Sequence, residues 1–129
     1  MKYTIDKQEK YLLIQLHEAK LDATVSPQLK SEFVTLNAEG YKNIILDMSQ
    51  VKYIDSSGLS AILVGNRLAN DAEGAFVLAG VTDHVMKLIK ISQLDSVLDI
   101  LPTVQEAVDS VFLSALESEL GNEDSEEKA

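Results

Sequence analysis

The chain has 129 residues, no cysteine and a formal net charge of -10 at pH 7. A chain of this length fits one domain with one core, and its 46% hydrophobic and 25% charged residues are typical of a globular protein. The acidic balance, with no cluster of Lys and Arg, argues against a nucleic-acid partner. The lack of cysteine excludes disulfides, thiol catalysis and thiolate metal sites.

No targeting or membrane-spanning segment is predicted. Residues 1–6 are polar and run straight into a strand-like segment, so they lack the apolar stretch of a secretory signal. The apolar stretches, such as residues 61–64, are far shorter than the roughly 20 residues of a membrane span. We therefore expect a cytoplasmic protein without membrane insertion.

The N-terminal third predicts a hairpin followed by a helix. Residues 3–6 and 11–16 have the composition of two strands, and the charged turn between them suits an antiparallel hairpin. Ser26 and Pro27 are typical of a helix start, with Ser26 as the N-cap, and Gly40 is typical of a helix end. Between them, apolar residues recur at helical spacing: Leu29, Phe33 and Leu36.

The rest of the chain alternates predicted strands and helices. Residues 43–47 hold a continuous aliphatic run, which predicts a central strand covered on both faces. The later elements are expected in this order: a helix from Ser56 to about Asn70, a strand over 75–79, a helix over 83–91, a strand over 97–100 and a helix from Pro102 to about Leu120. This order predicts an α/β fold, with a mixed β-sheet of about five strands packed with about four α-helices.

A single domain over residues 1–120 contains all of these elements. Residues 121–129 hold four acidic residues, one lysine and no large apolar residue, so we expect an acidic disordered tail there. The last helix carries an apolar stripe, which favours packing against the core over a dimer interface. The stripe comprises Val104, Ala107, Val108, Val111, Phe112 and Ala115.

The most informative segment is Asp55-Ser56-Ser57-Gly58, which opens a predicted helix. It resembles the signature of the STAS domain family, in its anti-sigma-factor antagonist type. The resemblance extends over residues 1–116 and includes an upstream turn, Leu21-Asp22-Ala23. Three positions depart from the family pattern, Ala19, Lys20 and Ser60, and they leave the partner-facing surface open to differences.

The resemblance implies that Ser56 accepts a phosphoryl group. A helix start suits this role, because its free N–H groups and the helix dipole can hold a phosphate, and the added charge beside Asp55 would repel a partner. Two alternatives stay open: Ser57 is the acceptor, or the tetrapeptide is only a helix N-cap. The phosphorylation loop around Ser56 comprises Asp55, Ser57 and Gly58, and the expected partner interface comprises Asp22, Ala23, Thr24, Leu59, Ser60 and Leu63.

The sequence does not predict an enzyme. A serine hydrolase needs a base beside its nucleophile, and the only histidines are His17, near a strand end, and His84, on a predicted helix. Two isolated histidines make a poor metal site, and no Gly-rich loop ending in Lys-Ser/Thr indicates nucleotide hydrolysis. We expect no catalytic, cofactor-binding or metal-binding residues, and ATP and magnesium would belong to a partner kinase.

The resemblance implies a phosphorylation-controlled partner switch that regulates transcription. The unphosphorylated protein would bind an anti-sigma factor that is also a serine protein kinase, phosphorylation of Ser56 would end the complex, and a serine phosphatase would restore it. The alternative is a non-catalytic STAS subunit of a lipid-transport ATPase, or a scaffold in a stress-signalling complex. For Asp22 and Asp47, a structural role in a turn or strand end and a functional role are both open.

Overall fold

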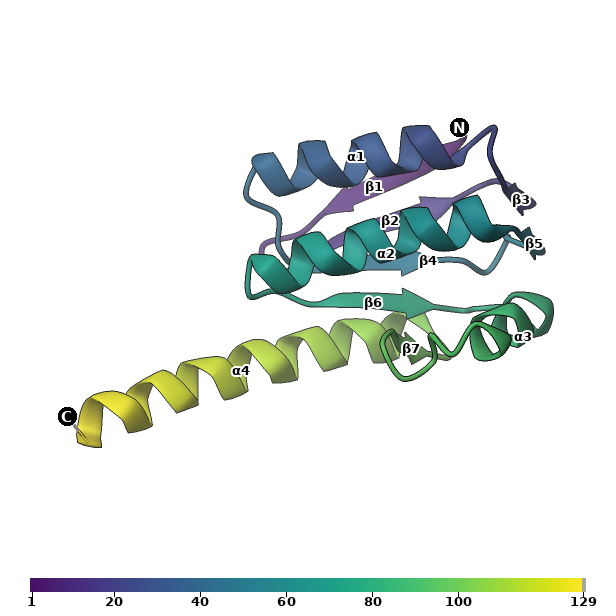
Figure 1. The fold of residues 1–129 in the computed structure, drawn as a ribbon. Helices are drawn as coiled ribbons and strands as arrows, with labels where there is room; N and C mark the ends of the chain where they lie inside the picture. Colours follow the sequence, from purple (N-terminus) through teal and green to yellow (C-terminus); the bar gives the residue numbers. More distant parts are fainter. Residues whose placement is uncertain (129) are drawn as a thin grey trace.

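A computed structural model describes residues 1–128, with side chains described for residues 1–120. Its main feature is a five-stranded sheet in the order β1-β2-β4-β6-β7 (Figure 1). The strands are β1 (Tyr3–Lys7), β2 (Leu12–Leu16), β4 (Ile44–Asp47), β6 (Phe76–Ala79) and β7 (Asp99–Leu101). The edge strand β1 runs antiparallel to β2, as the predicted hairpin requires, and the other neighbouring pairs are parallel.

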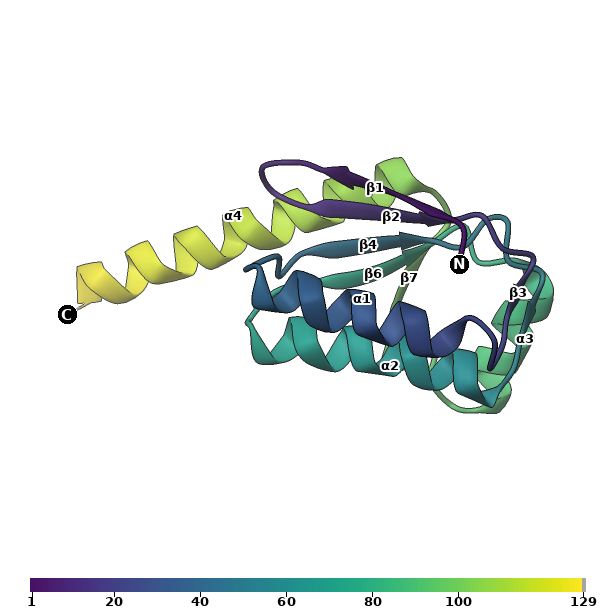
Figure 2. The ribbon, with the colours of Figure 1, turned by 90° about the horizontal axis from the view of Figure 1, so that it is seen from above.

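Helices cover both faces of this sheet. α1 (Ser26–Ala38) and α2 (Ser56–Asp71) lie side by side on one face, and α4 (Val104–Lys128) packs on the other (Figure 2). Side chains along β4 alternate between the faces, so that Ile44 and Leu46 join the core under α1 and α2. Ile45 joins the smaller cluster against α4. The predicted α/β fold with a mixed sheet is confirmed, and β4 is the central strand covered on both faces.

A second, two-stranded sheet was not predicted. It pairs β3 (Lys20–Leu21) with β5 (Tyr53–Ile54) in parallel. Strands of two residues are too short to show the alternation that reveals a strand in a sequence. α3 (Asp83–Ile91) contacts β5 at the same end of the molecule, which is also the end where α2 begins (Figure 1).

Several predicted boundaries need correction. The N-cap of α1 is Val25, whereas Ser26 is its first helical residue and is only 1% exposed. The last strand begins at Asp99, two positions later than predicted. α4 continues to Lys128, although the prediction ended it near Leu120. The division into a domain over residues 1–120 and a tail over residues 121–129 stays a prediction, and Ala129 lies outside the described residues.

Candidate phosphorylation and partner-binding site

The short β3-β5 sheet brings the two predicted parts of the site together. Leu21 is the register partner of Ile54, and both side chains are buried. The next residue, Asp55, donates its N–H to the Leu21 carbonyl at 3.4 Å. The loop that follows β3, residues 22–25, is therefore held beside the start of α2, although more than thirty residues separate the two segments in the chain.

Asp55 caps the N-terminus of α2. Its backbone is extended, with φ -112° and ψ -173°, and its Oδ1 accepts the Gly58 N–H at 3.0 Å and the Ser57 hydroxyl. These hydrogen bonds, that from Ser57 above all, hold the pKa of the Asp55 carboxyl below its usual range. The capping role that the sequence left open for the whole tetrapeptide therefore belongs to Asp55.

Gly58 allows α2 to approach β3 closely. A Cβ at this position would lie 2.3 Å from the Leu21 carbonyl oxygen and 2.6 Å from Ile54 Cγ1. Both distances are far shorter than ordinary van der Waals contacts, so any larger residue would push α2 away from β3. The glycine of the motif is thus explained by packing between the first turn of α2 and the backbone of β3.

The two serines of the motif lie in different environments. Ser56 is the first residue of α2 and is exposed, and its hydroxyl makes no hydrogen bond within the part of the chain that the structure describes. Ser57 is half-buried, donates to Asp55, and has its Oγ 3.2 Å from Ser26 Oγ. An incoming enzyme can reach the Ser56 hydroxyl without breaking an internal hydrogen bond, whereas Ser57 is engaged.

Ser26 belongs to this site, and the sequence did not predict it. Its buried hydroxyl donates to the Asp22 carbonyl at 2.7 Å and also contacts the Ser57 hydroxyl. It therefore links the loop after β3 to the first turn of α2. In the sequence, the Ser26-Pro27 pair is typical of a helix N-cap. Only the position of α2 shows that Ser26 instead links the loop after β3 to α2.

The loop after β3 is a tight turn with an acidic surface. Asp22 Oδ1 accepts hydrogen bonds from the Thr24 hydroxyl and, at 3.0 Å, from the Thr24 N–H. These bonds, that from the hydroxyl first, lower the pKa of Asp22, whereas desolvation and, after it, the nearby charge of Asp55 oppose the shift. Ala23 and Thr24 are exposed at the tip. The predicted partner residues Asp22, Ala23 and Thr24 thus lie beside Asp55 on one face.

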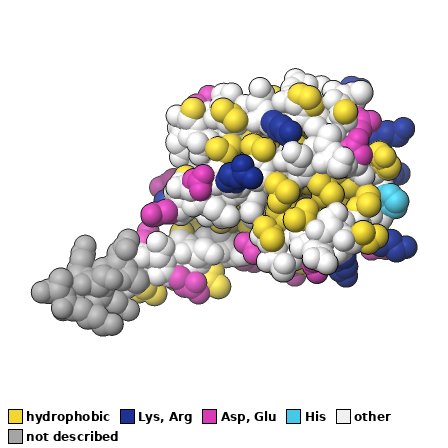
Figure 3. All heavy atoms as spheres, in the orientation of Figure 1, with side chains coloured by type: hydrophobic (Ala, Val, Ile, Leu, Met, Phe, Trp, Pro, Cys, Tyr) yellow, Lys and Arg dark blue, Asp and Glu magenta, His cyan; other side chains and the backbone are white. Residues whose placement is uncertain are grey.

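Of the expected partner-facing residues on α2, Leu59 is placed differently from the prediction. Its side chain is only 9% exposed and packs in the core, so it anchors α2 and does not offer a contact surface. Ser60 and Leu63 are half-buried, and Leu63 packs at the edge of the core. Figure 3 shows hydrophobic side chains gathered on this face between the first half of α2 and α3. Leu63 remains a candidate contact on α2.

The other residues singled out by the sequence lie outside this loop. Asp47 accepts hydrogen bonds from the Ser49 N–H at 3.0 Å and from Gln15 at 3.3 Å, which fits a role at the strand end. His17 lies 3.1 Å from the Thr4 hydroxyl, and His84 stacks on Tyr53. Among the described residues, no three His, Cys, Asp or Glu side chains gather where they could hold a metal ion.

The fold and the site define a small α/β domain that presents an exposed serine at a helix start. Residues 2–107 match the STAS domain, and the chain belongs to this family. The anti-sigma-factor antagonists of the family are non-catalytic, in agreement with the prediction that this chain is not an enzyme.

Two curated relatives are both named anti-sigma factor antagonists. The putative anti-sigma factor antagonist BtrV of Bordetella bronchiseptica is 28% identical over 116 residues, which cover 90% of this chain and 98% of the relative. The anti-sigma-B factor antagonist of Staphylococcus aureus is 24% identical over 81 residues, which cover 63% of this chain and 75% of the relative. Homologues of this chain are therefore named anti-sigma factor antagonists.

Solved structures share the fold. A putative anti-sigma factor antagonist from Thermotoga maritima matches with a TM-score of 0.76 at 24% identity, over 84% of this chain and 93% of that chain. The Bacillus cell-fate determinant SpoIIAA, in its phosphorylated form, matches with a TM-score of 0.67 at 22% identity, over 85% of this chain and 99% of that chain. Within residues 1–128, no helix combines the length and the apolar character that crossing a membrane requires.

Proposed function

We propose that this protein is a cytoplasmic anti-sigma-factor antagonist whose binding to its partner is controlled by phosphorylation of Ser56. The unphosphorylated form binds an anti-sigma factor that is also a serine protein kinase, and so releases a sigma factor for transcription. The kinase supplies ATP and magnesium. A bond forms between Ser56 Oγ and the γ-phosphorus as the bond from that phosphorus to the bridging oxygen breaks, ADP leaves, and the hydroxyl proton is released. A serine phosphatase removes the phosphate and restores binding.

The observation that carries this proposal is the free, exposed hydroxyl of Ser56 in the first turn of α2. Because Asp55 already caps the helix, modification of Ser56 removes no structural hydrogen bond. The N–H groups of the first turn and the positive end of the helix dipole favour a phosphate there. The names of the homologues support an anti-sigma factor as the partner.

The expected effect of the phosphate is electrostatic. It adds a charge of about -1.5 to -2 at neutral pH, on a face that already carries the carboxylates of Asp22 and Asp55. A partner that covers this face has to bury the added charge or move away from it. A cost of about 3 kcal/mol would weaken binding about a hundredfold.

The test uses the full chain as bait in lysate of its source organism, with retained proteins identified by mass spectrometry and the purified partner then titrated. We expect wild type and Ser56→Ala to bind equally and Ser56→Ala to resist phosphorylation. Ser56→Asp should bind more weakly than wild type, but by less than the hundredfold expected of the phosphate, because aspartate adds a smaller charge. Ser31→Asp, which adds the same charge to an exposed serine on α1, is the matched control and should bind like wild type.

Two results would contradict the proposal. Phosphate mapped to Ser57 in the kinase reaction would move the switch to the other serine. Equal recovery of a transport ATPase or of a signalling scaffold by wild type and Ser56→Asp would make the protein a constitutive subunit. The fold alone does not separate these functions, since a sulfate transporter family protein from Wolinella succinogenes shares it with a TM-score of 0.70 at 19% identity.

A further inference from the structure

The second half of α4 extends beyond the sheet and exposes apolar side chains. The first half packs on the sheet through Ala107 and Val111, which are 0% and 1% exposed. The helix then continues past the ends of the strands as a projecting arm (Figures 1 and 2). Four large apolar residues on this arm are about half exposed: Phe112 (47%), Leu113 (56%), Leu116 (52%) and Leu120 (51%).

These four residues, which we name the α4 stripe, form one continuous surface. At 3.6 residues per turn, their positions fall within about 100° of one another around the helix axis. The structure exposes eight large hydrophobic side chains over its described residues, and the stripe contributes half of them. The prediction that this helix packs on the core was correct for Ala107 and Val111, and Val104 and Val108 pack against the same cluster. Phe112 is about half exposed, with one edge against Tyr11 at a ring-centroid distance of 6.2 Å.

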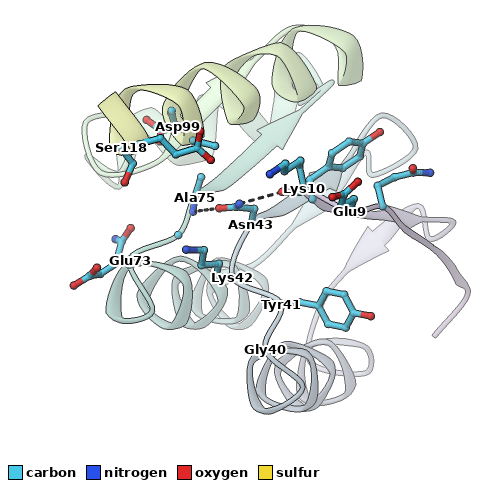
Figure 4. Close-up of a pocket in the computed structure, with 17 residues that line it drawn as sticks. Glu9, Lys10, Gly40, Tyr41, Lys42, Asn43, Glu73, Ala75, Asp99 and Ser118 are labelled. Carbon is cyan, nitrogen blue, oxygen red and sulfur yellow. Dashed lines mark hydrogen bonds between the residues drawn. The ribbon is translucent and has the colours of Figure 1, made fainter. Parts of the chain in front are cut away.

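The rest of the domain does not cover this stripe. The larger cleft, of about 600 Å³, lies where α4 leaves the sheet, and its lining is mostly polar (Figure 4). Its lining includes Lys42, Glu73, Asp99 and Ser118. Asn43 connects two segments of the lining, because its side chain donates a hydrogen bond to the Lys10 carbonyl and accepts one from the Ala75 N–H. A polar cleft offers no apolar cover, so α4 gains nothing by folding the stripe into it.

A smaller hollow beside the stripe is apolar. Phe112, Ala115 and Leu116 line it together with Lys10 and Glu119, and its volume is about 250 Å³. Such a hollow can receive one large aliphatic or aromatic side chain from a partner. Anchors of this kind in small pockets supply most of the binding energy at protein interfaces.

Charge identifies the chemistry of the occupant. Residues 91–120 contain six acidic residues and neither lysine nor arginine: Asp95, Asp99, Glu106, Asp109, Glu117 and Glu119. Two of them, Glu117 and Glu119, lie within the stripe segment itself. On α4 itself the surface is apolar along its centre and acidic at its edges, and Lys10 lies on one side at the hollow. The acidic edges of α4 complement a helix with apolar residues on one side and lysines or arginines beside them.

We propose that the α4 stripe binds a basic amphipathic helix of a partner protein, at a site separate from Ser56. Leu113, Leu116 and Leu120 are spaced i, i+3 and i+7, which is the pattern by which one helix packs along another. A second copy of this chain fits less well, because its own α4 carries the same acidic residues and like charges would meet.

The stripe lies at the opposite end of the molecule from the start of α2 (Figures 1 and 2). A partner helix on α4 therefore leaves Ser56 and the loop after β3 uncovered. Binding at the stripe is expected to be independent of the phosphorylation state of Ser56, and its failure would leave the proposed switch untouched.

The probe is a labelled synthetic peptide of about 18 residues, long enough to form a helix on its own, with leucines on one face and lysines or arginines beside them. Fluorescence anisotropy measures its affinity for the full chain. Two further peptides are controls: one with each basic residue replaced by glutamate, and a scrambled peptide of the same composition. We expect the basic amphipathic peptide to bind at least about tenfold more tightly than either control, and salt to weaken it.

Substitutions on α4 test whether the peptide binds this helix. Leu113→Ser/Leu116→Ser is expected to lower the affinity about tenfold, because two apolar contacts are lost. Val34→Ser, which removes an equally exposed apolar side chain (53%) from α1, should bind like wild type, and so should Ser56→Asp. Circular dichroism confirms that each variant is folded.

Three outcomes would overturn the proposal. The scrambled peptide could bind as tightly as the amphipathic one, which would show that only net charge matters. The double variant on α4 could bind as tightly as Val34→Ser. Sedimentation could show a dimer of the wild-type chain that Leu116→Glu dissociates, and the occupant of the stripe would then be a second copy.

Discussion

Replacing Gly58 by alanine tests whether close packing of α2 on β3 builds the site. The added Cβ would lie 2.3 Å from the Leu21 carbonyl oxygen, which is a backbone atom in the β3-β5 sheet and cannot rotate away. It would also lie 2.6 Å from Ile54 Cγ1. Relief therefore requires the first turn of α2 to move away from β3, together with the residues that it carries.

The size of the effect follows from two opposing contributions. Overpacking a well-packed site costs about 1 to 3 kcal/mol, and a clash with backbone belongs near the upper value. Alanine is a better helix former than glycine by about 1 kcal/mol, which offsets part of this cost. The free energy of unfolding should therefore fall by about 2 kcal/mol. At about 4 °C per kcal/mol for a domain of this size, Tm should fall by about 8 °C.

Differential scanning calorimetry of the full chain measures this change. Ser60→Ala, on the same helix but without added bulk, is the control and should keep Tm within about 2 °C of wild type. Two-dimensional NMR adds a local test, since the amide signals of Ala23 and Thr24 should shift in Gly58→Ala only. An unchanged or raised Tm for Gly58→Ala would refute the packing argument, because the helix preference of alanine would then be unopposed.

Two further predictions concern the hydrogen bonds around Ser56. The folded-state pKa of Asp55 lies below its unfolded value of about 3.9, so its ionised carboxylate stabilises the fold above that pH, and the contribution is lost as pH falls through the folded pKa. Urea unfolding from pH 7 to pH 3 should therefore show a weaker acid dependence of the free energy of unfolding for Asp55→Asn than for wild type. The control Asp71→Asn, at an exposed position, should behave like wild type. Equal acid dependence in the two variants would contradict this. Ser26→Ala removes a buried hydroxyl and should lower the free energy of unfolding by about 1 kcal/mol. The control Ser31→Ala, exposed on the same helix, should leave the free energy of unfolding unchanged. Equal values for the two variants would mean that the hydrogen bonds of Ser26 do not stabilise the fold.

The main sheet was predictable because its strands are long enough for their hydrophobic pattern to be recognised in the sequence. The aliphatic run at residues 44–46 marked a strand covered on both faces, and the sheet order places β4 in the middle. β3 and β5 were not predictable, since a strand of two residues has no period. The end of α4 was misplaced for a different reason. An acidic, polar composition indicates weak packing, but it does not stop a helix, and α4 continues to Lys128.

At the candidate site, the sequence predicted a set of residues but could not assign the helix cap among them. Asp55, Ser56 and Ser57 are adjacent, and each of them is a residue type favoured at a helix N-cap. Which one caps depends on backbone angles and on what faces each hydroxyl. Ser26 shows the same limit, because its partners Asp22 and Ser57 come from segments that only the pairing of β3 with β5 brings together.

This division of roles bears on the proposed phosphorylation of Ser56. If Ser56 were the cap, phosphorylation would change the group that accepts the first-turn N–H, and modification would alter the capping geometry of α2. Asp55 fills that role, and Ser57 holds Asp55 in place through its own hydroxyl. The adjacent Ser56 is left with a free hydroxyl on the surface. Its phosphorylation can therefore change the charge that a partner meets while the helix, the loop after β3 and the core beneath them keep their structure.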